Sequence, residues 1–354
     1  MLHAEPSSTG AAGGPAINDE SALETWLSLP DEALVESLGR LPGDIILLGA
    51  GGKMGFSLAR LAQRALEAAP STHRVIAVSR FSDPARREAF ARHGIDTAAA
   101  DLLDQTAVET LPDAGLVVVL AGLKFGTRSQ TARTWASNAL IPYHVMQRYA
   151  GRPIVAFSSG NVYGLVPVDG PGARVGDRLH PVGEYAMSVL ARERMYEYLA
   201  ERTGTPTALI RLNYACELRY GVLVDIARWV RDERPVPLTM GYFNVIWQGD
   251  ANRMTLRAWE HARPSTAAFN VTGPRRVGVR EVATWFARRW DRRIVWEGTE
   301  APDALLADAS STFDLLGRPS VGLEQMLDSI AQWIESGNPL WNKPTHFENR
   351  AGDF

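Results

Sequence analysis

A glycine-rich segment near residue 50 separates a short apolar run, 44–48, from a stretch with helical periodicity, 54–68. Three glycines, Gly49, Gly52 and Gly55, recur there at every third position. Glycines permit a tight turn and let backbone amides at a helix N-terminus face an anion. Because this loop lies between a strand and a helix at the start of an alternating series, it predicts a site for the diphosphate of a dinucleotide.

Short apolar runs alternate with helical patterns as far as residue 212. The runs predicted to be strands are 44–48, 75–78, 97–100, 116–120, 154–157 and 208–212. The helices predicted between them are 54–68, 84–93, 132–150 and 185–201. Continuous apolar strands joined by helices are typical of a parallel sheet covered on both faces. The sequence therefore predicts an α/β fold, a doubly wound parallel Rossmann sheet with a smaller C-terminal α/β substrate lobe.

The flanking segments differ in composition and periodicity. Ser, Gly, Ala and Pro dominate the first residues, which predicts disorder there, and apolar positions at helical spacing predict two short bracing helices around Pro30. The predicted organisation is a disordered tail (1–18), a helical N-terminal extension (19–42), a dinucleotide-binding Rossmann domain (43–212), a lobe that is mostly substrate-binding (213–336, with a part returning to the Rossmann sheet near 242–262) and a C-terminal tail (337–354).

The composition argues against several classes of function. The net charge is −3 and no basic block stands out, so we expect no nucleic-acid partner. No apolar run of membrane-spanning length and no signal-peptide pattern occur, so we expect no membrane partner. The single cysteine, Cys216, excludes an internal disulfide and favours a cytoplasmic protein, in which it would be a buried packing thiol. The histidines lack metal-ligand spacing, so we expect no metal site.

Lysine is rare in this chain. Of 37 Lys and Arg residues, only Lys53, Lys124 and Lys343 are lysines. Each lysine therefore stands out against an arginine-rich background.

Several segments together resemble the extended short-chain dehydrogenase/reductase family, of the NAD-dependent epimerase/dehydratase type. The glycine spacing G-x-x-G-x-x-G is similar to that family's loop. Segment 118–124 (VVLAGLK) is similar to the fourth-strand segment of UDP-galactose 4-epimerases, 154–164 (IVAFSSGNVYG) to the fifth strand and its S-S-x-x-V-Y-G turn, and 269–273 (FNVTG) to a later strand. The resemblance implies a Rossmann fold, a nicotinamide dinucleotide cofactor and redox chemistry.

The resemblance also implies a catalytic pair. Ser159, four residues before Tyr163, matches the catalytic serine, and Tyr185 matches the tyrosine of Y-x-x-S-K-L-x-x-E, the general acid/base at a substrate oxygen. The family's lysine, which lowers the tyrosine pKa and binds the nicotinamide ribose, is replaced by Val189. Tyr185 should then stay protonated near neutral pH, which suits carbonyl reduction better than alcohol oxidation. Lys124 either supplies a substitute charge or contacts a cofactor phosphate.

The second predicted strand ends in Ser79-Arg80, where an acidic residue would bind the adenosine ribose of NAD. Arg80 could pair with a 2′-phosphate, which favours NADP, with NAD as the alternative; Arg80 could also lie in a solvated loop with Arg86 and Arg87. The expected dinucleotide contacts are Gly49, Gly52, Lys53, Met54, Gly55, Ser79, Arg80, Asp101, Leu102, Ala121, Gly122, Lys124 and Asn138. The expected substrate contacts are Ser159, Asn161 and Asn213.

Two functions fit these residues. The first is an NAD(P)-dependent reductase or epimerase acting on a hydroxylated or keto sugar-like small molecule. The second, suggested by Val189, is a dinucleotide-binding sensor or subunit without turnover. Gly160-Asn161 replace the acidic pair of sugar-nucleotide dehydratases, which argues against elimination chemistry. The resemblance further implies a homodimer formed by the helices after the fourth and fifth strands.

Overall fold

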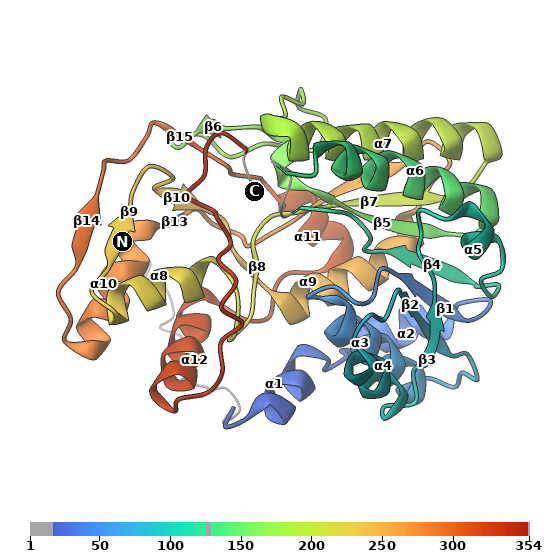
Figure 1. The fold of residues 1–354 in the computed structure, drawn as a ribbon, viewed down its shortest axis with the longest axis horizontal. Coiled ribbons are helices and arrows are strands. Elements are labelled where there is room, and N and C mark those ends of the chain that lie inside the picture. Colours follow the sequence, from blue (N-terminus) through green and yellow to red (C-terminus); the bar gives the residue numbers. More distant parts are fainter. Residues whose placement is uncertain (1–16, 125–128, 353–354) are drawn as a thin grey trace, which may run out of the picture.

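Seven parallel strands form the central sheet of the protein (Figure 1). The structure is a computed structural model and describes residues 17–124 and 129–352. The strand order is β12-β7-β5-β4-β1-β2-β3. The strands are β1 (Ile45–Leu48), β2 (Val75–Ser79), β3 (Asp96–Ala99), β4 (Leu116–Val119), β5 (Ile154–Ser159), β7 (Thr207–Leu212) and β12 (Ala267–Val271). The predicted doubly wound Rossmann fold is confirmed, and the order reverses between β1 and β4, where such folds bind ligands.

Helices cover both faces of the sheet because its strands are apolar on both sides. In β1, Ile45 and Leu47 face one hydrophobic cluster, whereas Ile46 and Leu48 face another. The first cluster is closed mainly by α2, α3 and α9, and the second by α5, α6 and α7. The helices that connect successive strands of the sheet are α3 (Gly55–Ala68), α4 (Pro84–Ala91), α5 (Gln105–Glu109), α6 (Thr131–Arg148) and α7 (Gly183–Thr203).

Two short N-terminal helices, as expected, precede the sheet. They are α1 (Glu20–Leu27) and α2 (Glu32–Gly39), and Asp19 and Asp31 cap their first turns. The apolar residues of α1 belong to the core of the C-terminal lobe, whereas those of α2 belong to the core of the sheet. The extension therefore braces both parts of the molecule. The disordered tail expected at 1–18 lies outside the described residues, except for positions 17 and 18.

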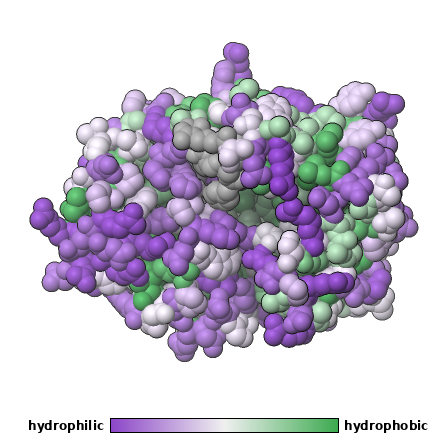
Figure 2. Space-filling view, in the orientation of Figure 1, coloured by the Kyte–Doolittle hydropathy of each residue, from purple (hydrophilic) through white to green (hydrophobic). Residues whose placement is uncertain are grey.

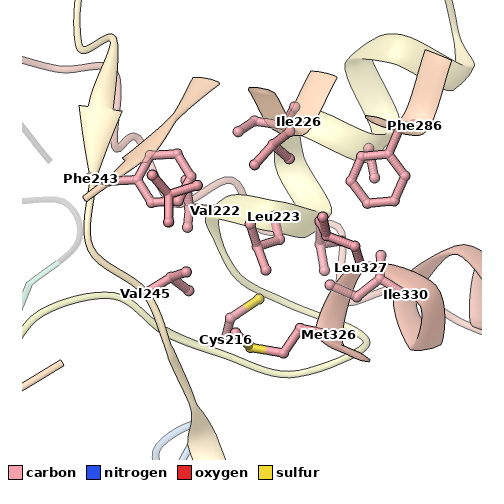
Figure 3. Close-up of a cluster of buried hydrophobic side chains, with 14 of the residues drawn as sticks. Cys216, Val222, Leu223, Ile226, Phe243, Val245, Phe286, Met326, Leu327 and Ile330 are labelled. Carbon is pink, nitrogen blue, oxygen red and sulfur yellow. The ribbon is translucent and has the colours of Figure 1, made fainter. Parts of the chain in front are cut away.

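The C-terminal lobe has a core of its own, formed by α8 (Val222–Arg231), α10 (Val279–Trp290) and α12 (Leu323–Glu335) (Figure 3). Cys216 lies in this core near Met326, and burial raises the pKa of its thiol. It is a buried, free cysteine. The remaining short elements are β6 (Val166–Pro167), β8 (Ala215–Cys216), β9 (Pro235–Pro237), β10 (Tyr242–Phe243), β11 (Ile246–Trp247), β13 (Val277–Gly278), β14 (Val295–Glu297), β15 (Asp303–Ala304), α11 (Ser310–Leu316), and the 3-10 turns Gly160–Tyr163 and Ala258–His261.

The chain returns to the sheet later than the sequence suggested. Within the expected segment, 242–262, helix α9 (Gln248–Arg257) packs over the sheet beside α3, with Ala251 and Met254 in the core. The returning strand is β12, which pairs in parallel with β7. The apolar positions of α9 recur at helical spacing, so this segment covers the sheet instead of extending it.

The C-terminal tail, drawn in red, runs from α12 past β8 and ends near β6 and β15 (Figure 1). Phe347 is 1% exposed in the core of the C-terminal lobe. Both the backbone amide and the hydroxyl of Thr345 donate to the carboxylate of Asp225, at 2.8 and 2.7 Å. The tail is thus an integral part of the lobe.

Hydrophilic residues dominate the face seen in Figure 2. Within 17–124 and 129–352, no helix is long and apolar enough to cross a membrane. The same ranges contain no group of three His, Cys, Asp or Glu side chains able to hold a metal ion.

Candidate active site

A cleft lies beyond the C-terminal ends of β1 and β4. It has two compartments of about 470 and 410 Å³, volumes typical of ligand sites. Gly52, Leu120, Gly122 and Leu123 line both of them, so the compartments are adjacent. We call them the adenosine compartment, which extends toward β2 and β3, and the reactive compartment, which extends toward β5 and α7.

The three loop glycines have different roles. Gly49 has φ +90°, and a Cβ there would lie 2.6 Å from the Ala121 amide nitrogen. A Cβ on Gly55 would overlap the carbonyl of Ala50. Gly52 has open space around it and lines the cleft. The outer glycines therefore shape the turn, and the middle one leaves room for a ligand to approach the backbone.

The adenosine compartment is lined by residues that follow β2, β3 and β4. Ser79, Arg80, Asp101, Leu102 and Ala121 all lie there. So does Arg86, whose guanidinium donates to the Gly51 carbonyl across the loop. Arg86 was expected to be a solvated residue; its position in the first turn of α4, the helix that follows β2, could have suggested a contact with the loop.

The reactive compartment brings Ser159 and Tyr185 together. Ser159 ends β5, Tyr185 lies in the first turn of α7, and their side chains are hydrogen-bonded. Tyr185 is 8% exposed. Burial raises its pKa, while Arg192 and the bond to Ser159 act in the opposite direction. Tyr185 is therefore a protonated phenol at neutral pH, able to donate to a substrate oxygen.

A buried polar network holds β5, α7 and β7 in register behind this pair. Arg211 donates to both carboxylate oxygens of Glu193, at 2.9 and 2.8 Å, and to the Tyr163 hydroxyl at 2.8 Å. Ser158 donates to Glu193 at 2.5 Å, and Tyr163 donates to Asn270 at 2.7 Å. Because the hydrogen-bonding groups of each side chain are paired within the network, these buried side chains fix the end of β5 against α7.

All three lysines of the chain line the cleft. Lys53 lies with Nζ 3.3 Å from the ring centroid of Tyr220, and Lys124 lies with Nζ 5.8 Å from that of Tyr185. Burial, together with the neighbouring Lys124 and Lys343, lowers the pKa of Lys53 to about 7. Burial lowers the pKa of Lys124 to about 8. Lys343 comes from the C-terminal tail, and the rarity of lysine was the one sequence feature that distinguished it.

Three predicted site residues, all asparagines, lie away from the cleft surface. Asn138 is 0% exposed and donates to Ser188 at 2.7 Å. Asn213 is 2% exposed and donates to the Leu305 carbonyl at 3.3 Å. Asn161 lines a separate small cavity beside the tail. Met54, by contrast, lines the reactive compartment.

The sheet order, the glycine loop and the positions of Ser159 and Tyr185 are similar to those of the extended short-chain dehydrogenase/reductase class. The model described as "NAD dependent epimerase/dehydratase family" matches residues 45–216. Through this segment the chain is similar to the NAD dependent epimerase/dehydratase family. A comparison with curated protein sequences gives no match.

Solved structures share the fold at low sequence identity. MoeE5 in complex with UDP-glucose and NAD is 22% identical with a TM-score of 0.67, covering 83% of this chain and 99% of that one. UDP-glucose 4-epimerase with UDP-glucose from Thermotoga maritima is 18% identical with a TM-score of 0.69, over 83% and 99%. RMD from Pseudomonas aeruginosa complexed with NADPH is 20% identical with a TM-score of 0.65, over 82% and 99%.

Proposed function

We propose that the protein is a nicotinamide-dinucleotide-dependent reductase or epimerase that acts on a hydroxylated or keto sugar-like small molecule. One observation carries the proposal. The bonded pair of Ser159 and Tyr185 lies in a cleft whose other compartment borders the loop of Gly52. A proton donor and a diphosphate site in one cleft are what hydride transfer to a carbonyl requires.

The residues present fit a dinucleotide. The Gly52 backbone is accessible, and α3 begins at Gly55 with no side-chain cap, so an anion can take that place. The groups that would hold the dinucleotide are the loop of Gly52, Ser79 with Arg80 at the adenosine end, and Gly122 near the reactive end. When bound, the cofactor supplies hydride chemistry.

The proton chemistry belongs to Tyr185. Its phenol donates a proton to the substrate oxygen as a carbonyl is reduced, and Ser159 donates a hydrogen bond to the same oxygen. For an epimerase, the same phenol would need to take the proton back. Burial opposes the anionic phenolate, so reduction is the easier direction.

We infer NADP as the preferred cofactor, with NAD as the alternative. Two arginines, Arg80 and Arg86, line the adenosine compartment, and Ser79 stands where a carboxylate would repel a 2′-phosphate. The solved relatives do not favour either cofactor, since MoeE5 is described with NAD and RMD with NADPH.

A sugar or nucleotide sugar fits the reactive compartment. Its described lining includes three cations, Lys53, Lys124 and Arg192, and no carboxylate. Such a lining favours a substrate with negative charge, and two solved relatives are described with UDP-glucose.

A homodimer through α6 and α7 is part of the proposal. Four exposed large hydrophobic residues lie on these two helices: Leu140, Tyr143, Met187 and Tyr198. A surface of this kind is suited to burial between two copies of the chain. A cytoplasmic location fits the buried free thiol of Cys216.

The decisive experiment combines dinucleotide titration with turnover on a panel of keto-sugars. Tyr185→Phe is expected to lower turnover roughly 100- to 10,000-fold, the range for loss of a general acid, with dinucleotide affinity unchanged. Tyr242→Phe, on β10 and outside both compartments of the cleft, is the matched control. Tight dinucleotide binding without turnover on any substrate would favour the alternative suggested by Val189, a dinucleotide sensor.

A further inference from the structure

Val189 leaves the catalytic tyrosine without the family's lysine, yet a cation lies on the same face of α7. Positions 185, 189 and 192 are four and three residues apart, so their side chains follow one another along the helix. Helical side chains lean toward the N-terminus, which directs Arg192 back toward Tyr185. Val189 itself is 0% exposed in a small apolar cluster with Val162.

The guanidinium of Arg192 is held in a fixed position. Its Nη1 donates to the Phe157 carbonyl at 2.7 Å, near the end of β5, and its Nη2 donates to the side chain of Asn138 on α6. A Cβ on Gly122 would overlap Nη2, so the guanidinium lies directly against the loop that follows β4. Three separate elements therefore place this charge.

Arg192 has a donor left over. It is 6% exposed and lines the reactive compartment, and its Nε has no hydrogen-bond partner among the described residues. An unsatisfied buried donor is unfavourable, more so when it is charged, so a bound hydroxyl would be favoured there. Asn138, implied by family resemblance to lie near the nicotinamide, instead anchors this arginine.

We propose that Arg192 takes the role of the lysine that Val189 replaces: its guanidinium holds the positive charge beside Tyr185 and donates a hydrogen bond to the nicotinamide-side ribose of the dinucleotide. This inference rests on the proposed function. Arg192 would act on the cofactor directly and on the phenol through its charge.

Lys124 is a weaker substitute for the missing lysine. It lies beside the Tyr185 ring, 5.8 Å from the centroid, and burial lowers its pKa to about 8. It therefore loses charge over a pH range in which arginine keeps it. Tyr220, from the segment before α8, also interacts electrostatically with Tyr185, and Glu184 precedes Tyr185 in the first turn of α7.

The test compares two nucleotides on two variants. Arg192→Gln removes the charge and keeps a donor, whereas Arg192→Lys keeps the charge. ADP shares the adenosine diphosphate of the cofactor but lacks the nicotinamide-side ribose. Calorimetry is expected to show that Arg192→Gln weakens dinucleotide binding about tenfold or more and leaves ADP binding unchanged, as for loss of a charge-assisted hydrogen bond.

The pH profile of turnover gives a second reading. In the alcohol-oxidation direction, Arg192→Gln is expected to move the rise in rate to higher pH, because the phenolate loses a fixed cation that stabilises it. Arg192→Lys should retain most of the wild-type profile. If each variant weakened dinucleotide and ADP binding equally, and the pH profile did not shift, the proposal would be overturned and Arg192 would be a purely structural clamp.

The two levels of inference fail differently. If the wild-type protein binds the dinucleotide no better than ADP, the proposed function itself is wrong, and the role of Arg192 with it. If wild-type binding is tight and Arg192→Gln leaves it unchanged, only the role of Arg192 is wrong. Should Arg192→Gln fail to fold, Arg192→Lys decides alone: it lacks Nε, so dinucleotide affinity should fall while ADP affinity stays.

Discussion

The two compartments of the cleft are built in different ways. Most of the lining of the adenosine compartment comes from short loops that directly follow β1, β2, β3 and β4; α6 and Lys343 of the tail complete it. The reactive compartment depends on side chains from distant segments, among them Lys53, Ser159, Tyr185 and Thr345. A loop that follows a strand can thus be specified by local sequence, whereas a cluster of side chains from distant segments forms only when the whole fold is in register.

The largest effect is expected at the network behind the reactive compartment. Glu193→Ala would leave Arg211, which is 7% exposed at its side chain, as a buried charge without its carboxylate. Loss of one partner of a buried ion pair costs roughly 3–5 kcal/mol, so the free energy of unfolding in urea should fall by about that amount.

The control is an exposed ion pair on the same helix. Arg194→Ala, which removes the surface pair with Glu197, should cost less than about 1 kcal/mol. Equal losses from Glu193→Ala and Arg194→Ala would mean that the buried network does not hold the reactive compartment together.

The next effect separates folding from binding within the glycine loop. Gly55→Val should destabilise the protein by roughly 1–3 kcal/mol, because its side chain would overlap the Ala50 carbonyl. Gly52→Val should leave the melting temperature unchanged, since space is open there, and yet weaken dinucleotide binding roughly 100-fold, equivalent to about 2.7 kcal/mol. Thermal melts and nucleotide titrations on both variants check this. Identical behaviour of the two variants would show that all the glycines serve folding alone.

Cofactor preference should change when the adenosine compartment is altered. The double variant Ser79→Asp with Arg80→Ala introduces a carboxylate and removes a cation, so the ratio of NADP to NAD affinity should fall roughly 10- to 100-fold. Arg87→Ala is the matched control, because Arg87 donates to Thr97 at 2.9 Å and does not line the cleft. If the double variant kept the wild-type ratio of NADP to NAD affinity, Ser79 and Arg80 would not determine the cofactor preference.

The smallest effect expected is a pH dependence from Lys53. Its pKa is lowered from 10.5 to about 7, so it is charged below neutral pH and loses charge above it. ADP affinity should therefore fall as pH rises through 7 and 8, by about tenfold or less, and Lys53→Met should reduce that fall. Comparing variant with wild type cancels the titration of the nucleotide. A slope that survives in Lys53→Met would exclude Lys53 as its source.

Local pattern alone determined much of the fold and part of the site. The strand and helix periodicities predicted six of the seven strands of the sheet and its main helices, because apolar spacing reflects burial on one or both faces. The same local logic located the loop of Gly52 between a strand and a helix, whereas Ser159 and Tyr185 were identified by resemblance to the family's motifs. The short helices α5 and α11 were not predicted, because they are too short to show a helical periodicity.

Tertiary structure decided which distant side chains meet. Arg192 follows Tyr185 by seven residues, but only its contacts with β5 and α6 place it in the lining of the reactive compartment. Lys343 reaches the adenosine compartment because the tail is anchored at Thr345 and Phe347, and Asn213 turns into the interior toward Leu305. A local pattern reports which face of an element is buried; the partner across that face depends on how whole elements pack.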